Sequence, residues 1–181
     1  SIMQMDAGLD TGALISSSMI PVGSRDSAET LTQRLAEAGA EALVETLVRL
    51  QRDGHVDALP QDEGGASYAR KISRDDAYVD WSQPAPAIDR RVRALNPTPG
   101  AVTMLNGEPI KLWVSEPVAG PVGGPGCVVR ADAGGLIVAC GGGALVIREL
   151  QRAGGRRLGA GEFLAGNPIG RGTLLGAAPR G

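Results

Sequence analysis

Near the start of the chain, one acidic segment carries the residues best suited to chemistry. It reads Asp6-Ala7-Gly8-Leu9-Asp10-Thr11-Gly12. A carboxylate on a glycine-flanked loop can assist proton movement in a reaction, because the backbone there can approach a substrate closely. Asp and Gly are also common turn residues, so composition alone favours a plain turn. The segment is therefore a candidate catalytic loop with two carboxylates, Asp6 and Asp10.

The second group of chemically useful residues is basic and lies later in the chain. Arginines and lysines that share a surface can neutralise nucleic-acid phosphates and release their counterions. With only 2 Trp, 2 Tyr and 1 Phe in 181 residues, recognition of backbone and shape is favoured over base stacking. The alternative is a solvated surface with ion pairs such as Asp89 with Arg93, four residues apart on a helix. The clusters are Arg70-Lys71-Arg74, Arg90-Arg91-Arg93 and Arg148-Arg152-Arg156-Arg157.

The overall charge hides a strong asymmetry between the two parts of the chain. The net charge of −2 argues, taken whole, against a nucleic-acid-binding protein. Residues 1–66, however, hold 11 acidic and 4 basic residues, whereas residues 67–181 hold 9 acidic and 14 basic residues. This split, −7 against +5, predicts two modules with different partners.

Composition also excludes several classes. A hydrophobic content of 43% with 21% charged residues is typical of a globular chain, and no apolar run is long enough for a bilayer. We expect no secretory signal and no membrane partner. Cys127 and Cys140 lie in apolar stretches and fit no metal spacing, so we expect reduced core thiols in a cytoplasmic protein. His55 stands alone in a turn, and we expect no metal site.

The candidate loop lies between two expected strands, Ser1–Met5 and Ala13–Pro21, and a long helix follows. The pattern predicts that Asp26 caps this helix and that Glu29 completes a capping box. Leucines recur at helical spacing up to Leu50, with a break expected at Gly39 and an end at Gly54. Residues 57–73 lose periodicity, are rich in Pro, Gly and acids, and are expected to form a linker.

The second part predicts one helix followed by strands. Ser82 is expected to cap a helix that ends at Asn96-Pro97, and Asn106-Gly107 predicts a hairpin. Five short strands with one helix are typical of a small barrel of the OB type, and Trp81 and Trp113 are expected to anchor its core. A tail without regular structure is expected from Asn167. The strands are expected at Ala101–Leu105, Ile110–Ser115, Cys127–Arg130, Leu136–Cys140 and Ala144–Leu150, and a helical turn at Gly159–Gly166.

An ordered series of short segments resembles the methionyl-tRNA formyltransferase family. Each segment alone is weakly specific, but their order along nearly the whole chain is specific. The resemblance is carried by Met3-Gln4-Met5-Asp6-Ala7-Gly8-Leu9-Asp10-Thr11-Gly12, Tyr68-Ala69-Arg70-Lys71-Ile72, Val79-Asp80-Trp81-Ser82, Arg93-Ala94-Leu95-Asn96-Pro97 with Pro99, Lys111-Leu112-Trp113, and Leu150-Gln151 with Ala153-Gly154 and Arg156-Arg157.

The resemblance implies an α+β chain in two modules. Residues 1–56 would be the end of a Rossmann-like catalytic domain, 57–73 a linker, and 74–181 an OB-like tRNA-binding domain. The implied reaction transfers a formyl group from 10-formyltetrahydrofolate to the amine of initiator methionyl-tRNA, in the cytoplasm and without a metal. No DNA partner is implied.

The resemblance also implies roles for individual residues. Asp10 matches the catalytic aspartate of the family, and Asp6, Gly8 and Leu9 would lie near the folate. The family's Asn-x-His pair and Ser-Leu-Leu-Pro loop are absent from these 181 residues, so we expect no transfer by this chain alone. Apolar side chains such as Ile2, Leu31 and Leu35 would then be exposed and could pair with another copy. The implied tRNA-binding residues are Arg70, Lys71, Arg90, Arg93, Arg156 and Arg157.

Three alternatives remain open at this point. The first is a related formyltransferase for a sugar amine or a folate hydrolase, which needs no tRNA module. The second is a non-catalytic RNA-binding or interaction module. The third follows from Asp10-Thr11-Gly12-Ala13, which also resembles the turn of retroviral-type aspartic proteases, where two chains share a carboxylate pair. Against this third alternative, a helical pattern spans 26–53, where that all-β fold continues with strands.

Overall fold

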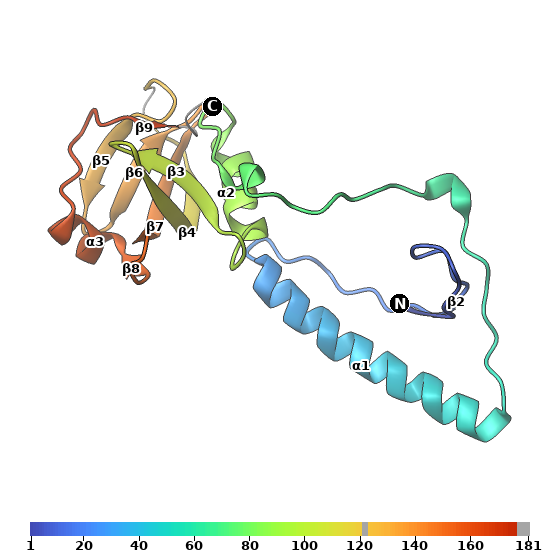
Figure 1. The fold of residues 1–181 in the computed structure, drawn as a ribbon. Coiled ribbons are helices and arrows are strands. Elements are labelled where there is room, and N and C mark those ends of the chain that lie inside the picture. The colour runs from blue at the N-terminus through green and yellow to red at the C-terminus, as the bar shows by residue number, and fades with distance from the viewer. Residues whose placement is uncertain (121–122, 177–181) are drawn as a thin grey trace. The chain divides into compact units, whose positions relative to one another are not determined.

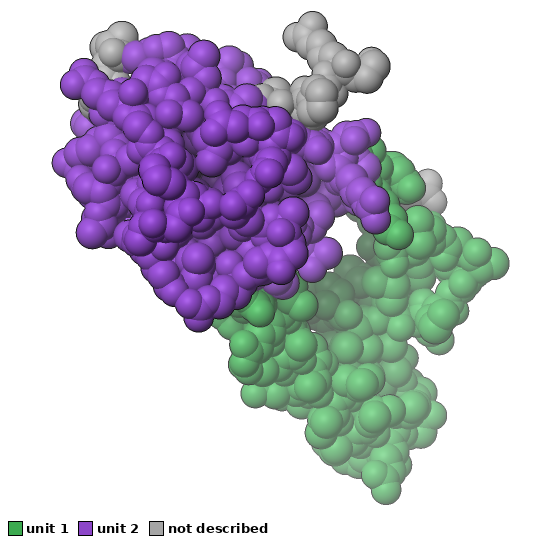
Figure 2. Space-filling view, turned by 60° about the vertical axis from the view of Figure 1, so that its left-hand side comes forward, with its two compact units in different colours: residues 1–71 green, residues 72–181 purple. Residues whose placement is uncertain are grey.

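The chain was analysed as a computed structural model that describes residues 1–120 and 123–176. It divides into two compact units, residues 1–71 and 72–181, which Figure 2 colours separately. No helix among the described residues is long and apolar enough to cross a membrane.

The first unit is a long helix with a small sheet. Strands β1 (Ile2–Met3) and β2 (Leu14–Ser16) pair antiparallel, so β2 is shorter than the strand expected over Ala13–Pro21. Helix α1 spans Ala28–Asp53 and is followed by a short 3-10 helix, η1 (Glu63–Gly65). The helical pattern expected after residue 26 is therefore confirmed, and it is inconsistent with the all-β protease alternative.

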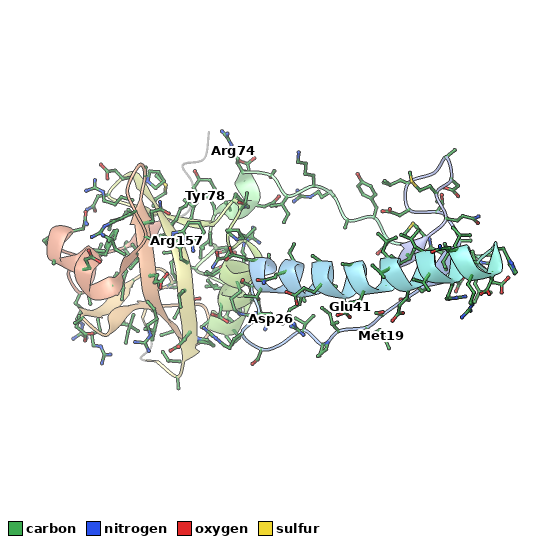
Figure 3. The ribbon with its side chains drawn as sticks, turned by 90° about the horizontal axis from the view of Figure 1, so that it is seen from below. Met19, Asp26, Glu41, Arg74, Tyr78 and Arg157 are labelled. Carbon is green, nitrogen blue, oxygen red and sulfur yellow. The ribbon has the colours of Figure 1, made fainter. Side chains whose placement is uncertain are left out.

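The start of α1 differs in detail from the sequence-based prediction. Ser27, not Asp26, is the N-cap, and Thr30, not Glu29, completes the capping box. Asp26 instead accepts a bond from the Gly23 amide at 2.7 Å and forms a 2.6 Å ion pair with Arg34 (Figure 3). The Gly23 hydrogen bond and the Arg34 charge hold the pKa of Asp26 below its usual range. Because the Asp26 carboxylate is already bonded to the preceding turn, the hydroxyl of Ser27 accepts the hydrogen bond that caps the helix.

Helix α1 is continuous through Gly39, contrary to the predicted break (Figure 1). A glycine inside a helix costs only about 1 kcal/mol relative to alanine, which 26 residues of helix can absorb. The helix ends as expected at Gly54, whose φ of 76° is left-handed. Leu35 is exposed as expected, whereas Ile2 and Leu31, which were also expected to be exposed, are half-buried. The other exposed apolar side chains of α1 are Leu43, Val44, Leu47, Val48 and Leu50.

The second unit contains a short 3-10 helix, two α-helices and a sheet. Helix α2 spans Ala85–Ala94 and follows Pro84, so Ser82 is not its cap. Ser82 instead donates from its hydroxyl to Asp80 at 2.6 Å. The other elements are η2 (Asp75–Ala77), β3 (Ala101–Leu105), β4 (Glu108–Val118), β5 (Val128–Asp132), β6 (Gly135–Ala139), β7 (Ala144–Arg152), β8 (Leu158–Gly159), α3 (Ala160–Gly166) and β9 (Leu175–Gly176).

The sheet curls until its two ends meet (Figure 1). Its strands follow the order β5-β6-β7-β4-β3-β9, with β8 paired to β7. The segment before β5 bonds to the segment of β9: the Val128 amide donates to Thr173 and the Leu175 amide to Gly126, both at 2.8 Å. The expected hairpin at Asn106-Gly107 is present, and both residues have positive φ. The tail expected to lack structure supplies β9, which the sequence pattern did not predict.

The core of the second unit lies inside this curled sheet. It is formed by alternate residues of the strands together with one face of α2 and the side chain of Phe163 on α3. Trp81 is 4% exposed, and its indole nitrogen donates to the buried Thr103 hydroxyl at 3.0 Å. Asp89 is also buried, and it accepts from Ser115 at 2.8 Å and pairs with Arg93 at 3.0 Å. This bonding satisfies the one carboxylate that α2 places in the core.

Cys140 gives a direct test of this core. Burial raises the pKa of its thiol to about 11. At pH 8 the thiolate fraction of Cys140 is then about two orders of magnitude below that of an unperturbed thiol. We therefore expect iodoacetamide to leave Cys140 unmodified in the folded chain at pH 8 and to modify it fully in denaturant, as followed by mass spectrometry. Fast labelling of Cys140 in the folded chain would contradict this packing.

Candidate catalytic loop and basic surface

The candidate catalytic loop connects β1 to β2 within the first unit. Its base is closed where the Gln4 amide donates to the Ala13 carbonyl at 2.9 Å. Inside the loop, the Asp6 carboxylate accepts from the Gly8 amide at 3.0 Å and from the Thr11 hydroxyl at 2.6 Å. Asp6 is therefore occupied in shaping the loop.

Asp10 occupies a special backbone position in this loop. Its φ of 57° lies in the left-handed region, where Asp is one of the few side chains tolerated. Gly12, two residues later, is buried, and a Cβ there would meet the Gln4 carbonyl oxygen at 1.7 Å. Only glycine allows this close approach. The Asp10 carboxylate is exposed, and within the described residues no hydrogen bond engages it.

A third segment holds the loop from the other side. Leu59 and Leu14 exchange two backbone hydrogen bonds of 2.8 Å each. Two residues further on, the side-chain nitrogen of Gln61 donates to the Asp10 carbonyl at 2.8 Å and to the Gly12 carbonyl at 2.7 Å. The segment expected as a linker therefore begins with residues that bond to the candidate loop.

The candidate tRNA-binding residues of the second unit are not equivalent. Arg93 pairs with the buried Asp89, and Arg156 pairs with Glu162. Arg90 is exposed on α2. Arg157 differs from the others, because its guanidinium lies 3.6 Å from the centre of the Trp113 ring (Figure 3). Arg70 and Lys71 belong to the end of the first unit, so they are not placed relative to these arginines.

Trp113 is the centre of a cluster that we call the Trp113 cluster: Asn96, Lys111, Trp113, Gln151 and Arg157. Lys111 lies 5.4 Å from the Trp113 ring and donates to the Pro99 carbonyl at 2.8 Å. The Trp113 indole nitrogen donates to Gln151 at 2.9 Å, and Arg157 donates to Asn96 at 3.3 Å. Among the described residues, neither Lys111 nor Arg157 forms an ion pair with a carboxylate. Two cations are thus held on one buried aromatic ring with their charges uncompensated.

Sequence reasoning missed Gln61, Lys111, Asn96 and Gln151. Gln61 lies in a segment without periodicity, and its role depends on a contact across 49 and 51 residues. Lys111, Asn96 and Gln151 belong to segments that resemble the family, but no local pattern assigns them a role. The alternation of Lys111, Leu112 and Trp113 on one strand is a signal that places Lys111 and Trp113 on the same face.

Among the described residues, no group of His, Cys, Asp and Glu is arranged to hold a metal ion.

With this geometry in place, comparison with known proteins assigns the chain to a class. The family model described as "Formyl transferase, C-terminal domain" matches residues 71–168, and the model described as "Formyl transferase" matches residues 1–47. The chain belongs to the formyl transferase family. The second match includes the candidate loop with Asp10.

Relatives within this family are named methionyl-tRNA formyltransferase, which confirms the resemblance seen in the sequence. One from Burkholderia multivorans is 49% identical over 173 residues, covering 95% of this chain and 53% of the relative. One from Aromatoleum aromaticum is 48% identical over 180 residues, covering 99% of this chain and 56% of the relative. The chain spans about half the length of the curated relatives it matches.

Solved structures share the fold at low identity. HypX from Aquifex aeolicus, crystallised with tetrahydrofolic acid, has a TM-score of 0.70 at 22% identity, covering 98% of this chain and 33% of HypX. An N-formyltransferase from Helicobacter canadensis, in complex with folinic acid and dTDP-3-aminofucose, has a TM-score of 0.61 at 16% identity, covering 80% of this chain and 53% of that protein. These structures establish the fold and carry no argument about substrate.

Proposed function

We propose that this chain is part of a protein that transfers a formyl group from 10-formyltetrahydrofolate to the amine of initiator methionyl-tRNA in the cytoplasm. The single observation that carries the proposal is identity of 48–49% with methionyl-tRNA formyltransferases over nearly the whole chain, which includes both units. A sugar-amine formyltransferase is the weaker proposal, because its solved examples match at only 16–18% identity.

In this proposal Asp10 is the catalytic group that the chain supplies. The methionyl amine attacks the formyl carbon, the new C–N bond forms, and the bond from that carbon to the folate nitrogen breaks. The amine must lose a proton and the departing folate nitrogen must gain one, and a carboxylate can assist this transfer directly or through a neighbouring base. The exposed and unengaged carboxylate of Asp10 is suited to this role, whereas Asp6 is bonded to Gly8 and Thr11. Gly8 and Leu9 would lie beside the folate.

The two units would divide the work. The first unit would be the end of a Rossmann-like catalytic domain, with the linker of 57–73 leading to an OB-like barrel that holds the tRNA. The curled sheet and its basic charge support the second assignment. The Asn-x-His pair would come from a part of the protein outside this chain, so we propose that residues 1–181 alone do not transfer formyl.

Within the barrel, Arg157 is the strongest candidate for a phosphate contact, and Lys111 joins the proposed set. An arginine stacked on an aromatic ring presents its charge in a fixed orientation, so little side-chain entropy is lost on binding. Arg93 and Arg156 already have acidic partners, which reduces their value as phosphate ligands. Arg70, Lys71 and Arg90 stay in the proposed set.

Arg157→Ala should weaken tRNA binding and reduce its salt dependence. The loss of one phosphate contact is expected to lower the slope of log K against log salt by about 1. Filter binding of initiator tRNA across a salt series measures this. Arg130→Ala is the matched control, because Arg130 pairs with Asp132 at 3.0 Å and should leave the slope unchanged. An unchanged slope for Arg157→Ala would remove Arg157 from the proposed set.

The substrate is tested by formylation assays on the full-length protein and on residues 1–181. We expect formyl-methionyl-tRNA from the full-length protein only, and no product from a nucleotide-linked amino sugar. Product from the amino sugar alone would select the sugar-amine proposal. RNA binding by a full-length protein without any formylation would select a non-catalytic RNA-binding module.

A further inference from the structure

The contact between Gln61 and the Asp10 loop has a consequence for the reaction. One amide nitrogen carries two protons, and both are used here, on the carbonyls of Asp10 and Gly12. Both carbonyls follow the Asp10 Cα in the chain. The two bonds therefore fix the peptide unit that leaves Asp10 and the one that leaves Gly12. Two bonds from one planar donor constrain both position and rotation, in the way that a bidentate contact does.

Few other hydrogen bonds among the described residues hold the part of the loop around Asp10. Asp6 stabilises the entry through Gly8 and Thr11, and Gly12 is held against the Gln4 carbonyl. Between these points Asp10 has a left-handed φ of 57°, a conformation that Asp tolerates but that is less favourable for an L-residue than the helical or extended regions. Among the described residues, the Gln61 bond to the Asp10 carbonyl is the one that engages the Asp10 peptide directly.

A backbone contact between Leu59 and Leu14 places Gln61 beside the loop. Leu59 exchanges paired hydrogen bonds with Leu14 of β2, which extends the β1–β2 sheet by one short bridge. Residues two apart on an extended segment share a side, so Leu59 and Gln61 approach β2 and the adjoining loop from the same side. The segment after α1 therefore supplies a side chain to the candidate site.

We infer that Gln61 is a positioning residue for catalysis, which holds the Asp10 carboxylate in its reactive orientation through hydrogen bonds to the Asp10 and Gly12 carbonyls. The inference rests on the proposed role of Asp10. Gln61 would contact neither the methionyl amine nor the formyl group of the donor. Its loss should lower the rate of the chemical step and leave substrate binding unchanged. Asp10 is exposed, so its carbonyl can bond to water instead. Gly12 is buried, so the loss of its partner should also lower the stability of the first unit slightly.

The test uses Gln61→Leu in the full-length protein, since leucine has a similar volume and donates no hydrogen bond. We expect kcat for methionyl-tRNA formylation to fall by about ten- to a hundredfold, the range typical of a misplaced catalytic group, with KM within about twofold. Gln51→Leu is the matched control, because Gln51 is exposed on the last turn of α1 and should leave kcat unchanged. Thermal unfolding should be the same for Gln51→Leu and the parent, and only slightly lower for Gln61→Leu, which still folds.

A double-mutant cycle separates positioning from a general structural role. If Gln61 acts through Asp10, then Gln61→Leu should lower kcat little further in an Asp10→Asn background. Equal falls in both backgrounds would overturn the inference, and so would a full kcat for Gln61→Leu while Asp10→Asn is impaired. Full activity of Asp10→Asn would instead overturn the proposed role of Asp10, so failure of the two ideas is distinguishable.

Discussion

Asp10→Asn in the full-length protein is expected to lower kcat for methionyl-tRNA formylation by about 10²- to 10⁴-fold. This is the range in which positioned acid–base groups contribute to catalysis. Asparagine keeps the volume of the side chain and tolerates the left-handed φ of 57°, so the loop should retain its conformation. What is lost is the negative charge and the proton-accepting capacity. Single-turnover formylation under saturating donor and tRNA measures the chemical step.

The control for this experiment is Asp57→Asn. Asp57 is an exposed carboxylate in the segment that follows α1, and its removal makes the same charge change in the same unit. We expect kcat within about twofold of the parent, since surface substitutions away from functional features have small effects. If Asp10→Asn and Asp57→Asn were equally active, Asp10 would be a turn residue, which is the reading that composition alone favours.

The fold could be predicted where the pattern is local. The strand Ala101–Leu105, the Asn106-Gly107 turn and the helical turn near Phe163 follow from propensity and periodicity, and the structure contains all of them. Strand β9 could not be predicted, because Leu175 and Gly176 form a strand only by pairing with Met104 and Leu105, some 70 residues earlier in the chain. The cap at Ser27 was missed because Asp26 and Ser27 are both good caps, and only the Gly23 contact decides between them.

The residues of the candidate site could likewise be predicted only where they lie close together in the sequence. Asp10 and its glycines could be found because the chemistry and the turn requirement lie in adjacent residues. Gln61 and the Trp113 cluster could not, because each joins residues that are distant in sequence, such as Gln151 with Trp113. Counting basic residues in the sequence also overestimates the number of arginines available to bind phosphate. Arg93 and Arg156 form ion pairs with acidic residues in the structure, whereas Arg157 lies on the Trp113 ring.

The second large effect is expected from Phe163→Ala, which should destabilise the second unit by about 3–5 kcal/mol. Phe163 is the only phenylalanine of the chain and is 1% exposed. It comes from α3, a helix of seven residues, too short to be stable without the contacts of its buried face. Removing the ring leaves a cavity inside the curled sheet and releases α3 from it. Because a domain has about 5–15 kcal/mol of stability in total, this change approaches the limit for folding.

Urea unfolding followed by tryptophan fluorescence measures this loss, since Trp81 and Trp113 both lie in the second unit and are 4% exposed when folded. Leu174→Ala is the matched control: Leu174 lies next to β9 but is 67% exposed, and its truncation should change the free energy of unfolding by less than about 0.5 kcal/mol. A loss below about 1 kcal/mol for Phe163→Ala would mean that the core can close without α3. Arg157 would then be held in place by its contacts with Trp113 and Asn96 without support from α3, and tRNA binding by this variant should equal that of the parent.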